Sequence, residues 1–545
     1  MNNENFTLAG QIVDITGRNT YPGRIVVEQG IISCVEALDE APSHYLLPGF
    51  VDAHIHIESS LLVPSEFARL AVPFGTVATV SDPHEIGNVL GLDGVHYMLA
   101  NGEQVPFKFY FGAPSCVPAT PFETAGATID VAGVTELLAD KRIKYLAEMM
   151  NWPGVLARDP EVMAKIAAAQ QAGKPVDGHA PGLRGDQASQ YIAAGISTDH
   201  ECFTAEEALD KLKHGMYVQI REGSAARNFA ALHRLLHDHA HRMMLCSDDK
   251  HPDSLIEGHI DQLVRRAVAA GIDVYKVLQA ACVNPVKHYG LEVGLLQPGD
   301  PADFIVVNNL QEFRVLQTYI NGQLVAQDGR SLLPHLAAEP VNQFACSPKQ
   351  AADFALPAEG KTIKVIEALD GELVTNRLDL PATIVNGLAV ADPQRDILKL
   401  TVVNRYADAP PAVAFIKGFG LQQGALASSV GHDSHNITAV GVDDESLARA
   451  VNLVIAEQGG LAAVGPDTEQ VLPLPVAGLM SNRDGYEVAQ DYIALDRLSK
   501  ELGSSLRAPF MTLSFMALLV IPALKLSDKG LFDGERFAFT EVFSS

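Results

Sequence analysis

The 545-residue sequence lacks closely spaced cysteines and basic clusters. Its six cysteines are scattered and none forms a CxxC pair, which argues against a disulfide framework or a zinc ribbon and favours a reducing cytoplasm. Lys and Arg number 40 against 66 Asp and Glu, a formal net charge of −26, and no basic block offsets this excess. We therefore expect neither a nucleic-acid partner nor binding to an anionic membrane surface.

The sequence also lacks segments typical of export or membrane insertion. Met1–Phe6 has neither the basic start nor the apolar run of a signal peptide, so none is expected. The longest apolar run, Phe510–Leu524, contains Pro522 and is shorter than the ~20 residues that span a bilayer. We interpret this run as a buried helix or strand pair in a cytoplasmic protein.

The pattern of apolar and turn-forming residues predicts three blocks. Residues 1–48 resemble short strands separated by turns, and residues 296–345 return to this character, with Asn321-Gly322 at a hairpin turn. We expect these two segments to form one composite β domain, split around a central block at 49–295. Residues 350–545 mix strands with helices and predict a separate C-terminal domain of the α/β or α+β type.

The central block alternates strand-like and helix-like stretches. Eight strand-like runs recur roughly 20–35 residues apart, as βα units require. They are Gly49–His56, Thr76–Ser81, Phe107–Phe111, Lys144–Met149, Pro175–His179, Ile196–His200, Met216–Ile220 and Arg242–Ser247. Eight such units match a (β/α)₈ barrel in number and size. The predicted fold class is therefore α/β: a TIM-like barrel with a small split β-sandwich domain and an additional C-terminal domain.

Metal-ligand residue types stand at the carboxyl ends of several strands, the face where barrels carry their active sites. His54 and His56 end the first strand, and residues two apart on a strand point the same way, so both can bind one cation. His179 and His200 end the fifth and sixth strands, and imidazole is the commonest metal ligand. Asp248, after the eighth strand, is expected to approach the metal and to act as the proton-transferring base.

Glu148 ends the fourth strand inside an apolar run. Burying a lone carboxylate is costly, so it must either bridge two metal ions or form a salt bridge in the core. We favour the bridge, because it joins four histidines and Asp248 into one binuclear site with a bridging hydroxide as nucleophile. The sequence leaves open whether Asp248 or Asp249 is the ligand.

Two more clusters are candidates for substrate binding. Asp82, His84 and Glu85 close the second strand, where they can contact a ring edge and move protons, although a capped helix start with exposed charges fits equally well. His432 and His435 precede a later strand. Their loop is interpreted either as a lid that covers the barrel mouth or as a remote surface loop.

Several motifs resemble one known superfamily. The segment Pro48–His56, Ser247-Asp248 and Gln297–Asp303 resemble the amidohydrolases. Within that superfamily, the bacterial adenine deaminases are similar to this chain over nearly its whole length, including the last ~200 residues that most amidohydrolases lack. The motifs that carry this resemblance are Thr79–Asn88, Ala147–Asn151, Pro175–Pro181 and Gly431–Asn436.

The resemblance implies hydrolytic deamination of adenine to hypoxanthine and ammonia, by attack of a metal-bound hydroxide at C6, in purine salvage. Glu148 then takes the place of the carboxylated lysine of many relatives. Family members work with manganese or iron, so two divalent transition-metal ions are implied, while the ligand types alone also permit zinc. The implied partner is the small-molecule substrate, and a homo-oligomer, most simply a dimer, is expected.

Other activities compete with this interpretation. Guanine or an N6-substituted adenine offers a similar ring to the same chemistry. A cyclic-amide hydrolase of the dihydroorotase or hydantoinase type usually carries a lysine at the active end of strand four, whereas this strand has Lys144 only at its start and Glu148 at its end. A scaffold with a decayed site is disfavoured by the complete ligand set, and a nucleotide-binding module by the lack of a phosphate loop.

Overall fold

Eight parallel strands form the centre of the molecule, which the computed structural model describes over residues 5–544. Two sheets, of order β5-β6-β7-β8-β9 and β10-β11-β12, are joined by bridges between Val176 and Ile196 and between Ile55 and Asp248, so the strands close into a barrel. The strands are Phe50–Ile55, Thr76–Ser81, Lys108–Ala113, Ile143–Met149, Val176–Gly178, Thr198–Asp199, Tyr217–Arg221 and Met243–Cys246. The predicted barrel is confirmed, and each predicted strand overlaps an observed one.

Helices cover the barrel strands, which are apolar and buried on both faces, as parallel strands usually are. The helices α1 to α14 span Pro64–Ala71, His84–Leu90, Leu92–Gly102, Val131–Ala139, Trp152–Ala157, Pro160–Gln171, Gly185–Ala193, Ala205–Lys213, Phe229–Leu232, Leu236–His239, Pro252–Leu255, Ile260–Ala269, Val274–Leu278 and Asn284–Tyr289. Among the described residues no helix is both long and apolar enough to cross a membrane.

The strands before and after the barrel join in one continuous eight-stranded sheet, of order β16-β15-β14-β13-β4-β1-β2-β3. The hairpin predicted at Asn321-Gly322 connects β14 to β15, and both turn residues have the positive φ that such a tight turn requires. The strands β1 to β4 and β13 to β16 span Phe6–Asp14, Asn19–Glu28, Ile31–Ala37, Tyr45–Pro48, Phe304–Val307, Val315–Ile320, Gln323–Gln327 and Arg330–Ser331.

The C-terminal domain is built on a second eight-stranded sheet, of order β19-β18-β23-β22-β25-β24-β26-β27, with α15 packed on one face and α17 near β24 and β25. Its strands β17 to β27 span Leu356–Pro357, Thr362–Ala368, Thr375–Pro381, Thr383–Val385, Leu388–Val390, Leu398–Val403, Ala412–Lys417, Ala425–Ser428, Ile437–Gly441, Gly460–Val464 and Glu469–Pro473. The remaining elements are α15 (Asp444–Ala456), α16 (Gly485–Glu501), α17 (Pro509–Ser514), β28 (Leu524–Ser527), β29 (Gly530–Asp533) and β30 (Ala538–Phe539).

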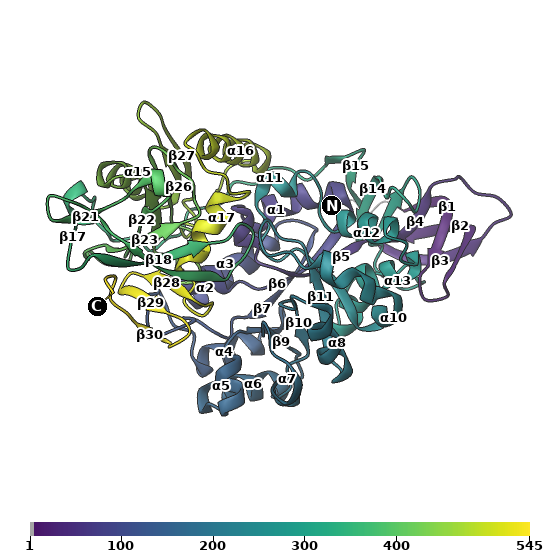
Figure 1. The fold of residues 1–545 in the computed structure, drawn as a ribbon. Coiled ribbons are helices and arrows are strands. Elements are labelled where there is room, and N and C mark those ends of the chain that lie inside the picture. The colour runs from purple at the N-terminus through teal and green to yellow at the C-terminus, as the bar shows by residue number, and fades with distance from the viewer. Residues whose placement is uncertain (1–4, 545) are drawn as a thin grey trace.

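The barrel lies between the two β-rich domains, with the N-terminal strands at one end of the molecule and the C-terminal domain at the other (Figure 1). The C-terminal domain is bonded directly to the barrel: the Ser481 backbone N–H donates to Leu61 O at 2.8 Å, and the Thr124 N–H donates to Asp528 Oδ1 at 2.9 Å. The run interpreted as a buried helix or strand pair forms α17, a 3-10 turn at Phe515–Ala517 and the start of β28.

Candidate active site at the barrel mouth

The ends of β5 and β12 are held together by one buried carboxylate. Asp52 Oδ1 accepts the backbone N–H groups of His54 and Ser247, at 3.3 and 3.0 Å, and its Oδ2 is 2.8 Å from His259 Nε2. Asp248 follows with a left-handed backbone (φ 58°), a conformation that Asp tolerates better than most residues. This arrangement turns Asp248 toward the histidines of β5.

His54, His56 and Asp248 converge on one point. His54 Nε2 and His56 Nε2 are 3.2 Å apart, and Asp248 Oδ1 lies 3.7 and 3.3 Å from them. Two ligands that each sit about 2.1 Å from one ion are separated by about 3.0–3.4 Å. These three separations are close to that range, so the donor set fits a divalent transition-metal ion.

Glu148 lies between this group and two more histidines. Its Oε1 is 3.5 Å from His56 Nε2, while its Oε2 is 2.7 Å from His179 Nδ1 and 3.2 Å from His200 Nε2. Burial alone would raise the pKa of Glu148, but the two neighbouring imidazoles hold it well below its usual range. A carboxylate shared by both groups of histidines is suited to bridging two cations.

The loops that carry His179 and His200 are tied to a buried lysine. Lys211 donates to Asp199 and Glu207, and to the backbone oxygen of Ala180 at 2.7 Å. Asp199 in turn accepts the Glu201 N–H at 2.8 Å. Asp199 is fully buried and orients the loops through these bonds.

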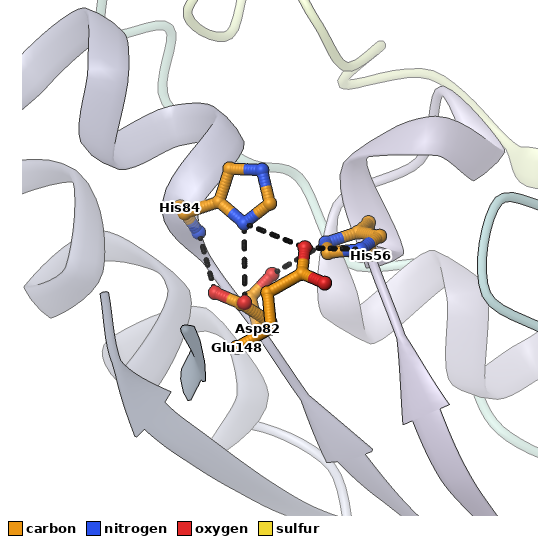
Figure 2. Close-up of side chains that lie close together, drawn as sticks. All are labelled: His56, Asp82, His84 and Glu148. Atoms are coloured by element: carbon orange, nitrogen blue, oxygen red, sulfur yellow. Dashed lines mark hydrogen bonds and ion pairs between the residues drawn. The ribbon is translucent and has the colours of Figure 1, made fainter. Parts of the chain in front are cut away.

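The cluster after β6 lies beside Glu148, as Figure 2 shows. His84 Nδ1 is 3.1 Å from Asp82 Oδ2 and 3.6 Å from Glu148 Oε1, and His56 Nδ1 is 3.2 Å from the Asp82 backbone oxygen. The helix start that the alternative expected is present, since α2 begins at His84 and the His84 N–H donates to Asp82 Oδ1 at 3.0 Å. Its exposed charges are not, because Asp82, His84 and Glu85 are all buried.

The loop with His432 and His435, between β24 and β25, reaches the barrel mouth and contacts Glu85. His432 Nδ1 lies 2.5 Å from Glu85 Oε1, and His435 Nε2 lies 2.5 Å from Glu85 Oε2. Burial would raise the pKa of Glu85, but His432 and the other facing imidazoles hold it well below its usual range. The alternative of a remote surface loop is therefore wrong.

Arg221, at the end of β11, is a further buried residue of the site. Its guanidinium donates to Glu201 with two nitrogens and to Asp248 Oδ2 at 2.5 Å. The neighbouring Glu222 pairs instead with Arg266. Successive side chains of a strand point to opposite faces, so the two-residue period of β11 could have predicted that only one of Arg221 and Glu222 points into the site.

The cavity at the barrel mouth is small, about 30 Å³. Barrel residues form its floor, and three apolar side chains of the C-terminal domain, Leu373, Phe515 and Leu518, lie among its lining residues. Phe515 stacks on His432 with ring centroids 4.7 Å apart. We call Leu373, Phe515 and Leu518 the apolar roof.

Lys525 holds two residues of the apolar roof. Its Nζ is fully buried and donates to the backbone oxygens of Leu373 and Phe515, at 2.7 and 2.9 Å. Burial lowers the pKa of Lys525 from 10.5 to about 7. Between these two pH values the unfolded chain binds more protons than the folded chain, so this residue makes the free energy of unfolding increase as the pH rises.

We predict that this pH dependence disappears in Lys525→Met. Relative to the variant, the wild type should gain on the order of 3–5 kcal/mol of stability between pH 7 and about 10.5. Chemical denaturation of both proteins across that range measures the difference. Parallel pH profiles would mean that Lys525 keeps its proton in the fold throughout.

The chain is similar to known proteins along almost its whole length. The model of the amidohydrolase family matches residues 45–325, and that of the adenine deaminase C-terminal domain matches residues 372–538. Curated adenine deaminases from Salinibacter ruber and from a Sulfurovum species are 56% and 57% identical to it, over 99% and 97% of this chain and 99% and 98% of their own. One from Methanosarcina barkeri is 53% identical over 99% of both chains.

Proposed function

The chain belongs to the adenine deaminase family of the amidohydrolases, and we propose that its barrel mouth catalyses the hydrolysis of adenine to hypoxanthine and ammonia. The observation that carries this proposal is the convergence of six buried ligand-type side chains beside Glu85, beneath the apolar roof. Those six are His54, His56, Glu148, His179, His200 and Asp248. Glu148 occupies the position on strand four where a cyclic-amide hydrolase usually carries a lysine, which argues against that activity.

These six residues would hold two divalent ions, which we propose to be manganese or iron. The fit is supported by the ligand spacings and by the buried His179 Nε2, which has no hydrogen-bond partner among residues 5–544. When bound, such ions lower the pKa of water and polarise an electrophile, and so supply a nucleophile at neutral pH.

Asp248 and Arg221 handle the proton of the attacking water. Arg221 donates to Asp248 Oδ2 and leaves Oδ1 directed at His54 and His56. Attraction to the buried guanidinium, against the opposing effect of burial, holds the pKa of Asp248 well below its usual range. We propose that Oδ1 accepts the proton of water as the C6–O bond forms and returns it to the leaving amine.

Glu85 faces the ring from the other side of the cavity. Two histidines fix its oxygens, and His84 Nε2 lies 3.5 Å from Oε1. We propose that Glu85 accepts the second proton of the attacking water and passes it to N1 of the purine, where the product carries it, and that His84 and Asp82 orient Glu85. The assignment of these roles, the oligomeric state and the cytoplasmic location stay predictions.

We predict that manganese-loaded protein deaminates adenine at least about 10³-fold more efficiently than adenosine or AMP, because the cavity is small and its lining, among residues 5–544, offers a phosphate no unpaired Lys or Arg: Arg221 is already bonded to Glu201 and Asp248. A panel of adenine, adenosine, AMP, guanine and dihydroorotate, assayed by kcat/KM, measures this. Chelation should abolish turnover and manganese should restore it. Comparable efficiency on AMP, or full activity in protein shown to be metal-free, would contradict the proposal.

A further inference from the structure

Asp433 is a buried carboxylate without a hydrogen-bond donor. It lines the active-site cavity at 3% exposure, and its Oδ2 has no partner among the described residues. The nearest cations lie beyond hydrogen-bond distance: His84 Nε2 and His432 Nδ1 are each 3.9 Å from Oδ1. A buried carboxylate left in this state costs free energy, which suggests that a ligand completes it.

The position of Asp433 is fixed by its neighbours in the chain. The His432 N–H donates to Ser514 O at 3.0 Å, and the Ser434 backbone oxygen accepts the Tyr406 hydroxyl at 2.6 Å. Asn436 Nδ2 donates to Thr124 O on the barrel side at 2.9 Å. These bonds fix the backbone on both sides of Asp433 and so keep its side chain in the cavity.

Every other carboxylate that lines the cavity, among residues 5–544, faces a donor at hydrogen-bond distance. Glu85 is bound by two histidines, Asp248 and Glu201 by Arg221, and Asp249 by the Ser59 hydroxyl at 2.5 Å. Glu148 is bound by His179 and His200. Asp433 is thus the carboxylate left free to accept a hydrogen bond from a bound molecule.

His84 sets the distance between Asp433 and the ligand cluster. Its Nδ1 faces Glu148 Oε1 at 3.6 Å (Figure 2). Its Nε2 is 3.9 Å from Asp433 Oδ1, so Asp433 lies one imidazole further from the reaction centre than His84. A purine whose C6 lies beside Glu148 extends its five-membered ring away from that centre. The free base carries a ring N–H there when its proton is on N7, whereas a nucleoside has none because its N9 bears the ribose.

We propose that the carboxylate of Asp433 accepts this ring N–H, so that Asp433 is a specificity residue that selects the free base over its N9-substituted forms. The inference rests on the proposed function and names the group that reads the far end of the substrate. A buried ring N–H must find an acceptor, and a charged acceptor gives the stronger bond. An N9 substituent removes the donor and leaves Asp433 unpaired.

The test uses purine and 9-methylpurine, which differ at this N–H and lack the reacting amine. On manganese-loaded wild type, calorimetry should give a lower Kd for purine. In Asp433→Ala the Kd of purine should rise about 10- to 100-fold, the loss of one hydrogen bond to a charged group, while that of 9-methylpurine stays the same or falls. Asp433→Asn, which keeps the size of the side chain, should give a smaller change of the same kind.

Equal changes in both Kd values, or an unchanged Kd for purine, would overturn the role of Asp433, because a residue that merely shapes the cavity acts on both ligands alike. Metal content should be wild type in both variants. Their unfolding temperature should be unchanged or higher, since an unpaired buried charge is removed. Adenine turnover by the wild type is measured separately, and its absence would overturn the proposed function. If the wild type does turn over adenine but the Kd values of purine and 9-methylpurine change equally in the variants, only the role of Asp433 is overturned.

Discussion

Replacing Glu148 by Gln is expected to remove both the metal and the activity. The carboxylate contacts His56 on one side and His179 and His200 on the other, and a neutral amide cannot bind two cations at once. We expect the content of divalent metal to fall well below the wild-type value. Turnover of adenine should fall at least about 10³-fold, equivalent to ~4 kcal/mol in the barrier. Elemental analysis and steady-state kinetics on the purified variant measure the two effects.

Glu66→Gln is the matched control for this experiment. Glu66 is equally buried, but it pairs with Arg69 and His335 away from the barrel mouth. Its loss should lower the unfolding temperature and leave the metal content unchanged. If Glu148→Gln behaves in the same way, Glu148 is an ion-paired core residue and the binuclear interpretation is wrong.

Glu85→Gln is expected to lower kcat about 10²- to 10⁴-fold with a wild-type metal content, which is the usual range for the loss of a positioned general acid or base. His432→Ala and His435→Ala each remove one of the two groups that fix Glu85, so a smaller fall, about 10- to 100-fold, is expected. Steady-state kinetics with elemental analysis and an unfolding curve for each variant separates catalysis from folding.

The control is His288→Ala, which removes a half-buried imidazole bonded to Ser197 outside the site. It should leave kcat unchanged. Wild-type kinetics in both the His432 and His435 variants would show that the loop between β24 and β25 only joins the two domains.

The barrel and its ligand-bearing strand ends could be predicted because both depend on local patterns. Runs such as Thr76–Ser81 are apolar, β-branched and spaced for βα units, and residues at their carboxyl ends must meet at one face. His54, His56 and Glu148 therefore came together as expected, although their roles as ligands stay predictions. The partners of Glu85 come from about 350 residues later in the chain, and no local pattern encodes such a contact.

The contacts of Arg221 and Asp433 could not be predicted from the sequence around them. Arg221 stands next to Glu222 in sequence, but the strand period sends the two to different partners, Glu201 and Arg266. Asp433 is notable for a bond that it does not make, which becomes visible only when all its neighbours are placed. The apolar roof could not be predicted either, because nothing in the local sequence of Leu373 or Phe515 distinguishes a residue that lines the cavity from one in the hydrophobic core.

The apolar roof leaves only a small cavity, about 30 Å³, beside the ligand cluster, so its side chains have to give way when a purine enters. The apparent affinity for adenine is then its intrinsic affinity multiplied by the fraction of molecules in which the roof has moved. The free energy that holds Leu373, Phe515 and Leu518 in place is thus subtracted from substrate binding. If the roof has to move again before hypoxanthine leaves, the rate of that motion is an upper bound on kcat that is independent of the chemistry at C6.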